Sequence, residues 1–200
     1  MVTRRRSNST LRWEDVLSAY TIGMFPMADP DDGSISWYAP DPRGIIELEE
    51  CRPSRSLRRT LRSGLFSVSW NTVFRSVLDA CAERDETWIS EDIKGAYAEL
   101  HDRGLAHSVE TWRNGSLVGG LYGVSLGGVF FGESMFTHET DASKVALITL
   151  TERMRMRGLV LLDAQFMTTH LQQFGCTNIS RQQYMKRLES ALSMSCSIYP

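Results

Sequence analysis

Apolar residues follow a strand-like period over five stretches of the chain. Asn114-Gly115 and Gly127-Gly128 are typical two-residue hairpin turns, so the three stretches that they separate form a meander. A further apolar run ends just before Asn71, and another begins after Gly158. The predicted strands are therefore residues 65–70, 106–112, 117–125, 129–135 and 159–165.

Helical periodicity fills the segments between these strands. Asn71 and Ser90 are typical N-cap residues of two successive helices, and Gly104 ends the second of them. A long helix is predicted from about 142 to 156. From residue 63 onward the order of elements is therefore β, α, α, β, β, β, α, β, α, with helical stretches near 168–174 and 180–192 closing the chain.

The first part of the chain is richer in turns than the rest. A short helix over residues 14–22 precedes a turn-rich passage and two short strands, and Pro40 and Pro42 between these strands rule out a continuous central strand. We therefore predict a small N-terminal lobe with a basic helix at residues 1–62 and a larger domain at residues 63–200.

Composition and charge limit the class of protein. The chain has 200 residues, 42% of them hydrophobic, which is enough to bury a sizeable core. Its apolar runs are only strand-sized and its Arg4-Arg5-Arg6 start leads into polar residues, so we expect no membrane span, no signal peptide and a cytoplasmic location. The cysteines and histidines show no ligand spacing, so no metal is expected.

Two carboxylates interrupt apolar strands. Glu133 and Asp163 stand where an unpaired charge is costly, which indicates a site. Asp163 and Gln165 are two residues apart, so their side chains should share one side of the strand. A purely structural alternative stays open, in which Asp163 pairs with Lys144 or an arginine and Glu133 pairs with a buried cation.

The order of elements is similar to that of the N-acetyltransferase (GNAT) fold, whose mixed sheet opens between its fourth and fifth strands. We therefore expect an α+β fold: a GNAT-like mixed sheet with flanking helices, plus a small reduced N-terminal lobe, with Glu133 and Asp163 on either side of the opening. Acetyltransferases of this fold bind coenzyme A at a glycine-rich turn. The equivalent turn here, Thr137–Lys144, has two acids and no glycine, so no cofactor is expected.

Several unusual motifs, spread from about Ala19 to Leu188, resemble those of the bacterial leucyl/phenylalanyl-tRNA-protein transferases. That resemblance implies transfer of leucine or phenylalanine from aminoacyl-tRNA to proteins that begin with Arg or Lys, which marks them for degradation under the N-end rule. The matching motifs are Gly23-Met-Phe-Pro26, Trp37-Tyr-Ala-Pro-Asp-Pro-Arg43, Ser54-Arg-Ser56, Thr87-Trp-Ile89, His107-Ser-Val-Glu110, Leu117-Val-Gly-Gly-Leu-Tyr-Gly-Val124, Gly132-Glu-Ser-Met-Phe136, Ala142-Ser-Lys144 and Asp163-Ala-Gln165.

Such a reaction needs a group that accepts or orients the amine proton and a group that stabilises the carbonyl oxygen. We expect Asp163 to accept the proton or orient the amine, and Gln165 to position the carbonyl or relay the proton. The resemblance implies that Glu133 binds the cationic acceptor. The predicted substrate-binding residues are Trp37, Tyr38 and Trp88, which could stack on the terminal adenine or simply pack; Leu121, Phe130 and Met135, which could shape the amino-acid pocket; and Ser134.

A helix capped by Ser54 carries basic residues on one side, while Leu57 and Leu61 anchor its other side. We predict that these basic residues bind tRNA phosphates, with a solvated basic face as the alternative. They are Arg55, Arg58, Arg59 and Arg62. Two other functions stay open at this point: an acyl-CoA-dependent N-acyltransferase of the same fold, and a non-catalytic tRNA- or peptide-binding module.

Overall fold

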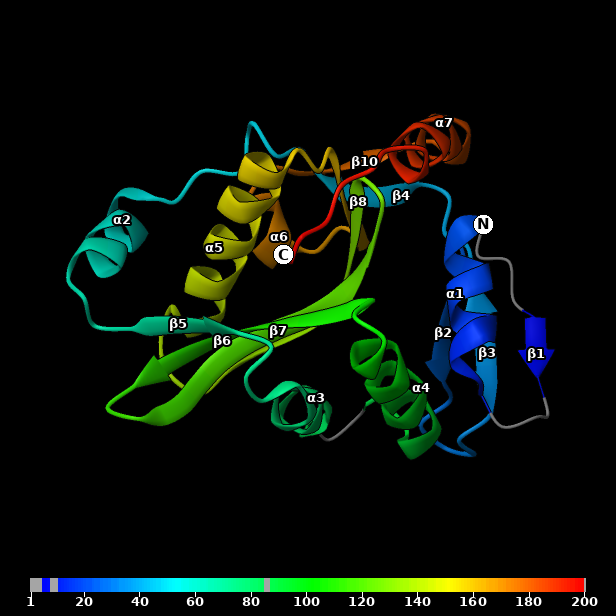
Figure 1. Ribbon diagram of the computed structural model, residues 1–200, viewed down its shortest axis with the longest axis horizontal. Coiled ribbons are helices and arrows are strands. Elements are labelled where there is room, and N and C mark those ends of the chain that lie inside the picture. The colour runs from blue at the N-terminus through cyan, green and yellow to red at the C-terminus, as the bar shows by residue number, and fades with distance from the viewer. Residues whose placement is uncertain (1–4, 8–10, 85–86, 200) are drawn as a thin grey trace.

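A seven-stranded mixed sheet lies at the centre of the molecule (Figure 1). The computed structural model describes residues 5–7, 11–84 and 87–199, with the backbone alone for 5–7; the rest of the predicted polar start lies outside the described residues. The strand order is β10-β4-β9-β8-β7-β6-β5. These strands are β4 (Arg43–Ile46), β5 (Ser67–Trp70), β6 (Ala106–Arg113), β7 (Ser116–Leu126), β8 (Val129–Thr137), β9 (Leu161–Gln165) and β10 (Cys176–Ile179).

Strands β8 and β9 are parallel neighbours, whereas the other neighbouring strands of this sheet are antiparallel. The two strands pair only from Val129 opposite Leu161 to Phe131 opposite Asp163. β8 continues to Thr137 without β9 beside it. The sheet therefore opens between the two strands that carry Glu133 and Asp163, and the predicted α+β fold with a mixed sheet is confirmed.

A second, three-stranded sheet belongs to the N-terminal part of the chain, in the order β1-β3-β2. It consists of β1 (Arg5–Ser7), β2 (Phe25–Ala28) and β3 (Ile35–Tyr38), and α1 (Trp13–Thr21) precedes β2. The sequence predicted turns where β2 lies. Pro26 fits in β2 because this strand is at an edge of its sheet, where a missing N–H donor is tolerated.

Strand β4 corrects the predicted boundary after residue 62. It was assigned to the N-terminal lobe, but it lies inside the large sheet, hydrogen-bonded to β9 on one side and to β10 on the other. Ile45 and Ile46 are buried on opposite faces of that sheet, which explains why this strand is held there. The division into two domains otherwise stays a prediction.

Helices cover both faces of the large sheet (Figure 1). One buried cluster joins the sheet to α1, α3, α4 and α7, and the other joins it to α2 and α5, with Leu171 of α6 packed against it. Asn71 is not the cap of α3, because its φ is +56° and its side chain bonds His107 and the Ser108 N–H instead. The helices are α2 (Arg55–Arg62), α3 (Phe74–Ala82), α4 (Glu91–Asp102), α5 (Ala142–Arg157), α6 (Thr169–Gln172) and α7 (Arg181–Leu192).

Candidate active site

A cavity of about 310 Å³ lies where β8 and β9 diverge. One part of its wall is polar and comes from the two diverging strands. Another part is apolar and comes from the same strands and from α5. Predicted site residues in the wall are Trp88, Leu121, Glu133, Ser134, Met135, Asp163 and Gln165. The structure thus brings the polar and apolar candidates together around one space.

Glu133 is presented to the cavity by an irregularity in β8. Tyr122 of β7 pairs with Ser134, but the next residue, Gly123, pairs with Gly132. Glu133 is therefore an extra residue on its strand, and such bulges redirect side chains next to functional sites. The sequence alone gives no sign of this bulge, because the apolar run continues on both sides of it.

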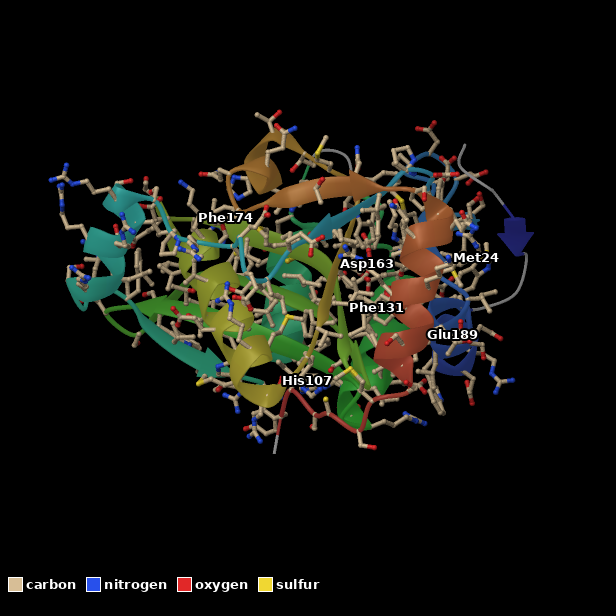
Figure 2. The ribbon with its side chains drawn as sticks, turned by 90° about the horizontal axis from the view of Figure 1, so that it is seen from above. Met24, His107, Phe131, Asp163, Phe174 and Glu189 are labelled. Carbon is tan, nitrogen blue, oxygen red and sulfur yellow. The ribbon has the colours of Figure 1, made fainter. Side chains whose placement is uncertain are left out.

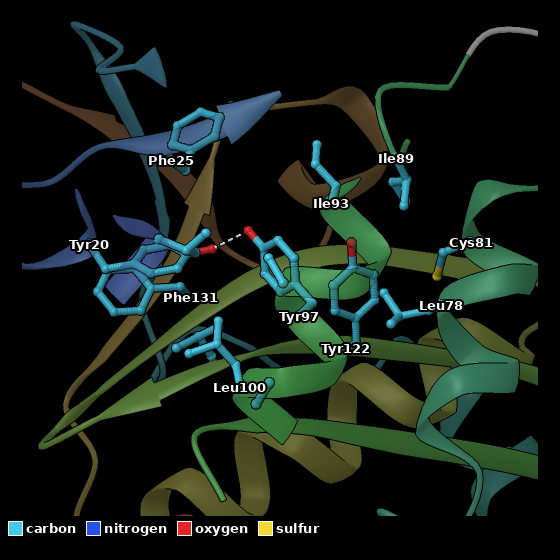
Figure 3. Close-up of a cluster of buried hydrophobic side chains, with 14 of the residues drawn as sticks. Tyr20, Phe25, Leu78, Cys81, Ile89, Ile93, Tyr97, Leu100, Tyr122 and Phe131 are labelled. Carbon is cyan, nitrogen blue, oxygen red and sulfur yellow. Dashed lines mark hydrogen bonds between the residues drawn. The ribbon is translucent and has the colours of Figure 1, made fainter. Parts of the chain in front are cut away.

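The Glu133 carboxylate is buried and held by three neighbours. Tyr20 donates to Oε1 at 2.6 Å, and Gln165 Nε2 donates to the same oxygen at 2.7 Å. Tyr97 donates to Oε2 at 3.0 Å, and its hydroxyl lies 2.6 Å from that of Tyr20 (Figure 3). Burial raises the pKa of Glu133 to about 7, although the tyrosine hydrogen bonds oppose the rise. This carboxylate therefore changes charge near neutral pH.

Asp163 is engaged more completely than Glu133. Arg43 donates Nε to Oδ1 at 2.9 Å and Nη2 to Oδ2 at 2.6 Å, and both side chains have no exposed surface. Tyr184 donates its hydroxyl to Oδ2 at 2.6 Å, and the N–H of Gln165 donates to Oδ1 at 2.9 Å. Asp163 lies close to Phe131 and α7 in Figure 2. The arginine alternative left open by the sequence is thus realised by Arg43, whereas Lys144 pairs with Asp141 at 2.8 Å.

Gln165 links the two carboxylates through an unusual backbone. Its φ is +62°, and the pairing of β9 with β4 skips Ala164, because Gly44 pairs with Gln165 and Ile45 with Asp163. A Cβ on Gly44 would lie 2.7 Å from the main chain of Phe166 and Met167. The segment that follows Gln165 therefore passes so close to β4 that only glycine fits at position 44. Glu133, Gln165 and Asp163 therefore form one connected hydrogen-bonded unit.

The remaining predicted substrate-binding residues do not all reach this cavity. Phe130 is fully buried and is not among the described residues of the cavity wall, so its assignment to the pocket is corrected. Trp37 and Tyr38 are half-buried, pack against the core, and are not among the described residues of the cavity wall. Trp88 is half-buried and does line it.

The structure adds residues that sequence reasoning missed. Tyr20 and Tyr97 hold Glu133, while Arg43 and Tyr184 hold Asp163. Tyr122 also lines the cavity, and its buried hydroxyl has no partner among the described residues. The tyrosines sit at helical or strand core positions and look like packing residues in sequence. Only Arg43 carried a signal, because it is a lone cation at the start of β4, separated from the apolar pair Ile45 and Ile46 by Gly44 alone.

The four predicted basic residues of α2 gather around a hollow of about 530 Å³, away from the cavity. Ser54 caps the helix by accepting the Leu57 N–H, and Leu57 is buried against the protein. Figure 1 places α2 beyond α5, at one end of the molecule. Those arginines, Arg55, Arg58, Arg59 and Arg62, are all exposed.

Within the described part of the chain, no three or more His, Cys, Asp or Glu residues are grouped so that they could hold a metal ion. None of its helices has both the length and the apolar character needed to cross a bilayer.

Two solved structures are weakly similar to this chain. A ribosomal-protein-alanine N-acetyltransferase from Brucella melitensis superposes with a TM-score of 0.40 and 15% identity, covering 54% of this chain and 84% of that one. A functionally unknown conserved protein from Staphylococcus epidermidis gives a TM-score of 0.47 and 12% identity, over 88% and 68% of the two chains.

Sequence comparison is far more specific. Residues 45–189 match the family described as leucyl/phenylalanyl-tRNA protein transferase, and residues 10–41 match the N-terminal domain of the same family. The leucyl/phenylalanyl-tRNA–protein transferase of Chlorobaculum parvum is 51% identical over 187 residues, covering 92% of this chain and 96% of that protein. That of Gloeobacter violaceus is also 51% identical, with 94% and 97% covered. The chain therefore belongs to the leucyl/phenylalanyl-tRNA–protein transferase family.

Proposed function

We propose that this enzyme transfers leucine or phenylalanine from aminoacyl-tRNA to the amino terminus of proteins that begin with Arg or Lys. The product would be marked for degradation in the cytoplasm. The observation that carries the proposal is the joining, in one cavity, of the polar unit Glu133–Gln165–Asp163 with an apolar wall of leucine-sized side chains. Family membership supports the use of aminoacyl-tRNA and a protein as the two substrates.

The charges around the cavity suit a single cationic acceptor. Asp163 and Arg43 form a bidentate pair and so neutralise each other. Ionised Glu133 then places a negative charge in the buried part of the cavity, where an ammonium group gains most from it. Arg84 also lines the cavity, but it is exposed and donates to Ser134 and to the Met135 carbonyl rather than to Glu133. We therefore assign Glu133 to binding the acceptor cation and receiving a proton from the attacking amine, and Asp163 to orientation rather than proton transfer.

The main contribution of the protein to this reaction is to position the acceptor amine against the ester carbonyl. The acceptor amine attacks the ester carbonyl, a C–N bond forms, the C–O bond to the ribose breaks, and the ribose oxygen leaves with a proton. Because the ester is already activated, no enzyme nucleophile is required. Gln165 is placed beside Glu133, where its amide can orient the carbonyl or pass a proton.

The apolar part of the cavity supports an uncharged, medium-to-large side chain on the donor. Its wall includes residues from β4, β7, β9 and α5, which pack around the opening between the strands. One methylene in such a pocket is worth about 1–3 kcal/mol, so a graded preference among leucine, phenylalanine and methionine is expected. These residues are Ile46, Leu121, Leu147, Leu150 and Leu162.

The direct experiment offers the purified protein Phe-tRNA, Leu-tRNA or acetyl-CoA, each with a peptide that begins with Arg and one that begins with Glu. We expect transfer only from the two aminoacyl-tRNAs and only to the Arg peptide. Acetyl transfer without aminoacyl transfer would replace the proposal with the acyl-CoA-dependent activity, and tRNA binding without transfer would indicate a binding module.

Replacing Glu133 with Gln tests the acceptor role. The pKa of Glu133 is raised to about 7, so wild-type kcat/KM for an Arg peptide should rise with pH through about 7 as the carboxylate ionises. Glu133→Gln should lose this limb and show a KM for the peptide raised at least severalfold, with the KM for aminoacyl-tRNA little changed. The amine of the peptide titrates in both assays, so the variant should keep the part of the rise that is due to the amine and lose only the part that is due to Glu133. An unchanged acidic limb in the variant would refute the assignment.

The arginines of α2 are proposed to contact tRNA phosphates. Contacts with phosphates release counterions, so replacing Arg58 and Arg62 with Ala should make the slope of log affinity against log salt shallower by roughly 1–2, and should weaken different tRNAs about equally. Fluorescence-based tRNA binding at several salt concentrations measures this. Arg75→Ala with Arg103→Ala is the matched control, because these two exposed arginines lie on α3 and after α4. A slope equal to wild type would leave α2 as a solvated surface.

A further inference from the structure

Arg43 is held more tightly than a solvent-facing arginine could be. Its guanidinium has no exposed surface, bonds Asp163 through two nitrogens, and donates Nη1 to the carbonyl of Gly23 at 3.1 Å. It also lies over two aromatic rings, 4.9 Å from the centroid of Phe25 and 4.6 Å from that of Tyr184. Only a planar, forked cation can make all of these contacts at once.

Tyr184 completes the enclosure of Asp163 from α7. Its hydroxyl donates to Oδ2 at 2.6 Å, and its ring faces the Arg43 guanidinium. Each oxygen of Asp163 then accepts two hydrogen bonds: Oδ1 from Arg43 Nε and Gln165 N, and Oδ2 from Arg43 Nη2 and Tyr184. A carboxylate engaged in this way has a fixed orientation and little capacity left for a substrate.

The fixed carboxylate has a consequence for Gln165. A non-glycine residue at a φ of +62° is strained and keeps that conformation only when its surroundings enforce it. Oδ1 of Asp163 holds the Gln165 N–H at 2.9 Å, and Nε2 of Gln165 then reaches Oε1 of Glu133 at 2.7 Å. A continuous path of contacts thus runs from Arg43 and Tyr184, through Asp163, to the two groups that face the substrates.

We propose that Arg43 and Tyr184 are positioning residues for the transfer reaction: they fix the Asp163 carboxylate, which in turn fixes the main chain of Gln165. This inference rests on the proposed function. It predicts that weakening either residue slows the chemical step itself. A merely structural pair would instead change the fraction of folded enzyme and leave the folded molecules as fast as before.

Single-turnover kinetics separate these two possibilities. With enzyme in saturating excess over Phe-tRNA and a saturating Arg peptide, the rate constant reports the chemistry of folded enzyme, and circular dichroism of the same sample reports how much of the enzyme is folded. Tyr184→Phe keeps the ring over Arg43 and removes only the bond to Oδ2. We expect its rate constant to fall on the order of tenfold with the folded fraction kept, as for loss of one charge-assisted hydrogen bond.

Arg43→Lys provides the second variant. Lysine keeps the positive charge but cannot donate to both oxygens of Asp163 as the planar guanidinium does. Asp163 and Gln165 should then shift slightly, and a small displacement at a reacting centre lowers the rate constant roughly 10²-fold. Tyr199→Phe is the matched control, because this exposed tyrosine stacks on His107 and is not among the described residues of the cavity wall, and it should react at the wild-type rate.

The outcomes are distinct. A wild-type rate constant in Tyr184→Phe, whatever its folded fraction, overturns the inference and leaves the pair as structural. Should Arg43→Lys not fold, Tyr184→Phe alone decides. Absence of transfer by the wild-type enzyme from either aminoacyl-tRNA would instead refute the proposed function.

Discussion

Gln165→Ala is expected to lower turnover by roughly 10²–10⁴ while the protein keeps its fold. The side chain of Gln165 bonds only Glu133 among the described contacts, at 2.7 Å, and Glu133 keeps Tyr20 and Tyr97 when that bond is lost. No charge is left unpaired. Ala at a φ of +62° is as unfavourable as Gln, so the substitution does not relieve the backbone strain at this position. The expected loss of turnover therefore reports the loss of the Gln165 side chain.

The measurement is kcat with Phe-tRNA and an Arg peptide, accompanied by thermal melting and tRNA binding. Gln182→Ala is the matched control, because Gln182 is an exposed residue of α7 and its loss should change neither activity nor stability. Turnover within a few-fold of wild type in a well-folded Gln165→Ala protein would remove Gln165 from the reaction.

Asp163→Ala should behave differently, with a loss of about 3–5 kcal/mol in the free energy of unfolding. From sequence alone this variant is expected to be slow but folded. The structure changes that expectation, because Arg43 has no exposed surface and would be left as a buried charge without its carboxylate. The Tyr184 hydroxyl and the Gln165 N–H would lose their acceptor as well.

Urea denaturation followed by circular dichroism gives the free energy of unfolding. Asp102→Ala is the control, since it breaks the exposed pair with Arg75 and should leave the free energy of unfolding nearly unchanged. Adding Arg43→Met to Asp163→Ala should restore part of the loss, because the unpaired charge is removed too. Stability within about 1 kcal/mol of wild type in Asp163→Ala would contradict the burial of this pair.

Local patterns predicted the elements that depend on local physics. The meander from β6 to β8 was predicted because its hairpin turns and its alternating apolar residues are adjacent in the sequence. The end of α5 was predicted because Gly158, with a φ of +76°, is a typical residue at the C-terminus of a helix. Glu133 and Asp163 were predicted as site residues because a carboxylate within an apolar strand is costly to bury without a partner or a function. Their positions flanking the opening of the sheet follow from the order of the elements.

Features that depend on distant residues were not predictable in the same way. β4 has only four residues, and whether it joins the lobe or the large sheet is decided by β9 and β10, which come more than a hundred residues later. The bulge at Glu133 and the unpaired Ala164 are irregularities in how one strand pairs with its neighbour, so the sequence of either strand alone does not predict them. The role of Tyr184 likewise exists only once α7 lies beside Asp163.

The placement of β4 has a consequence for how the protein is made. The ribosome delivers β4 early, yet both of its partner strands come late, and so do Asp163 and Tyr184, which enclose Arg43 together with the earlier Gly23 and Phe25. Arg43 and Asp163 are separated by 120 positions. Contacts between such distant positions form slowly, and an unpaired strand is open to wrong partners in the meantime. A nascent chain can therefore form the meander and α5 before β9 and α7 emerge, but it acquires the connected unit of Glu133, Gln165 and Asp163 only after them. A copy that stops before α7 would lack the Tyr184 bond to Asp163.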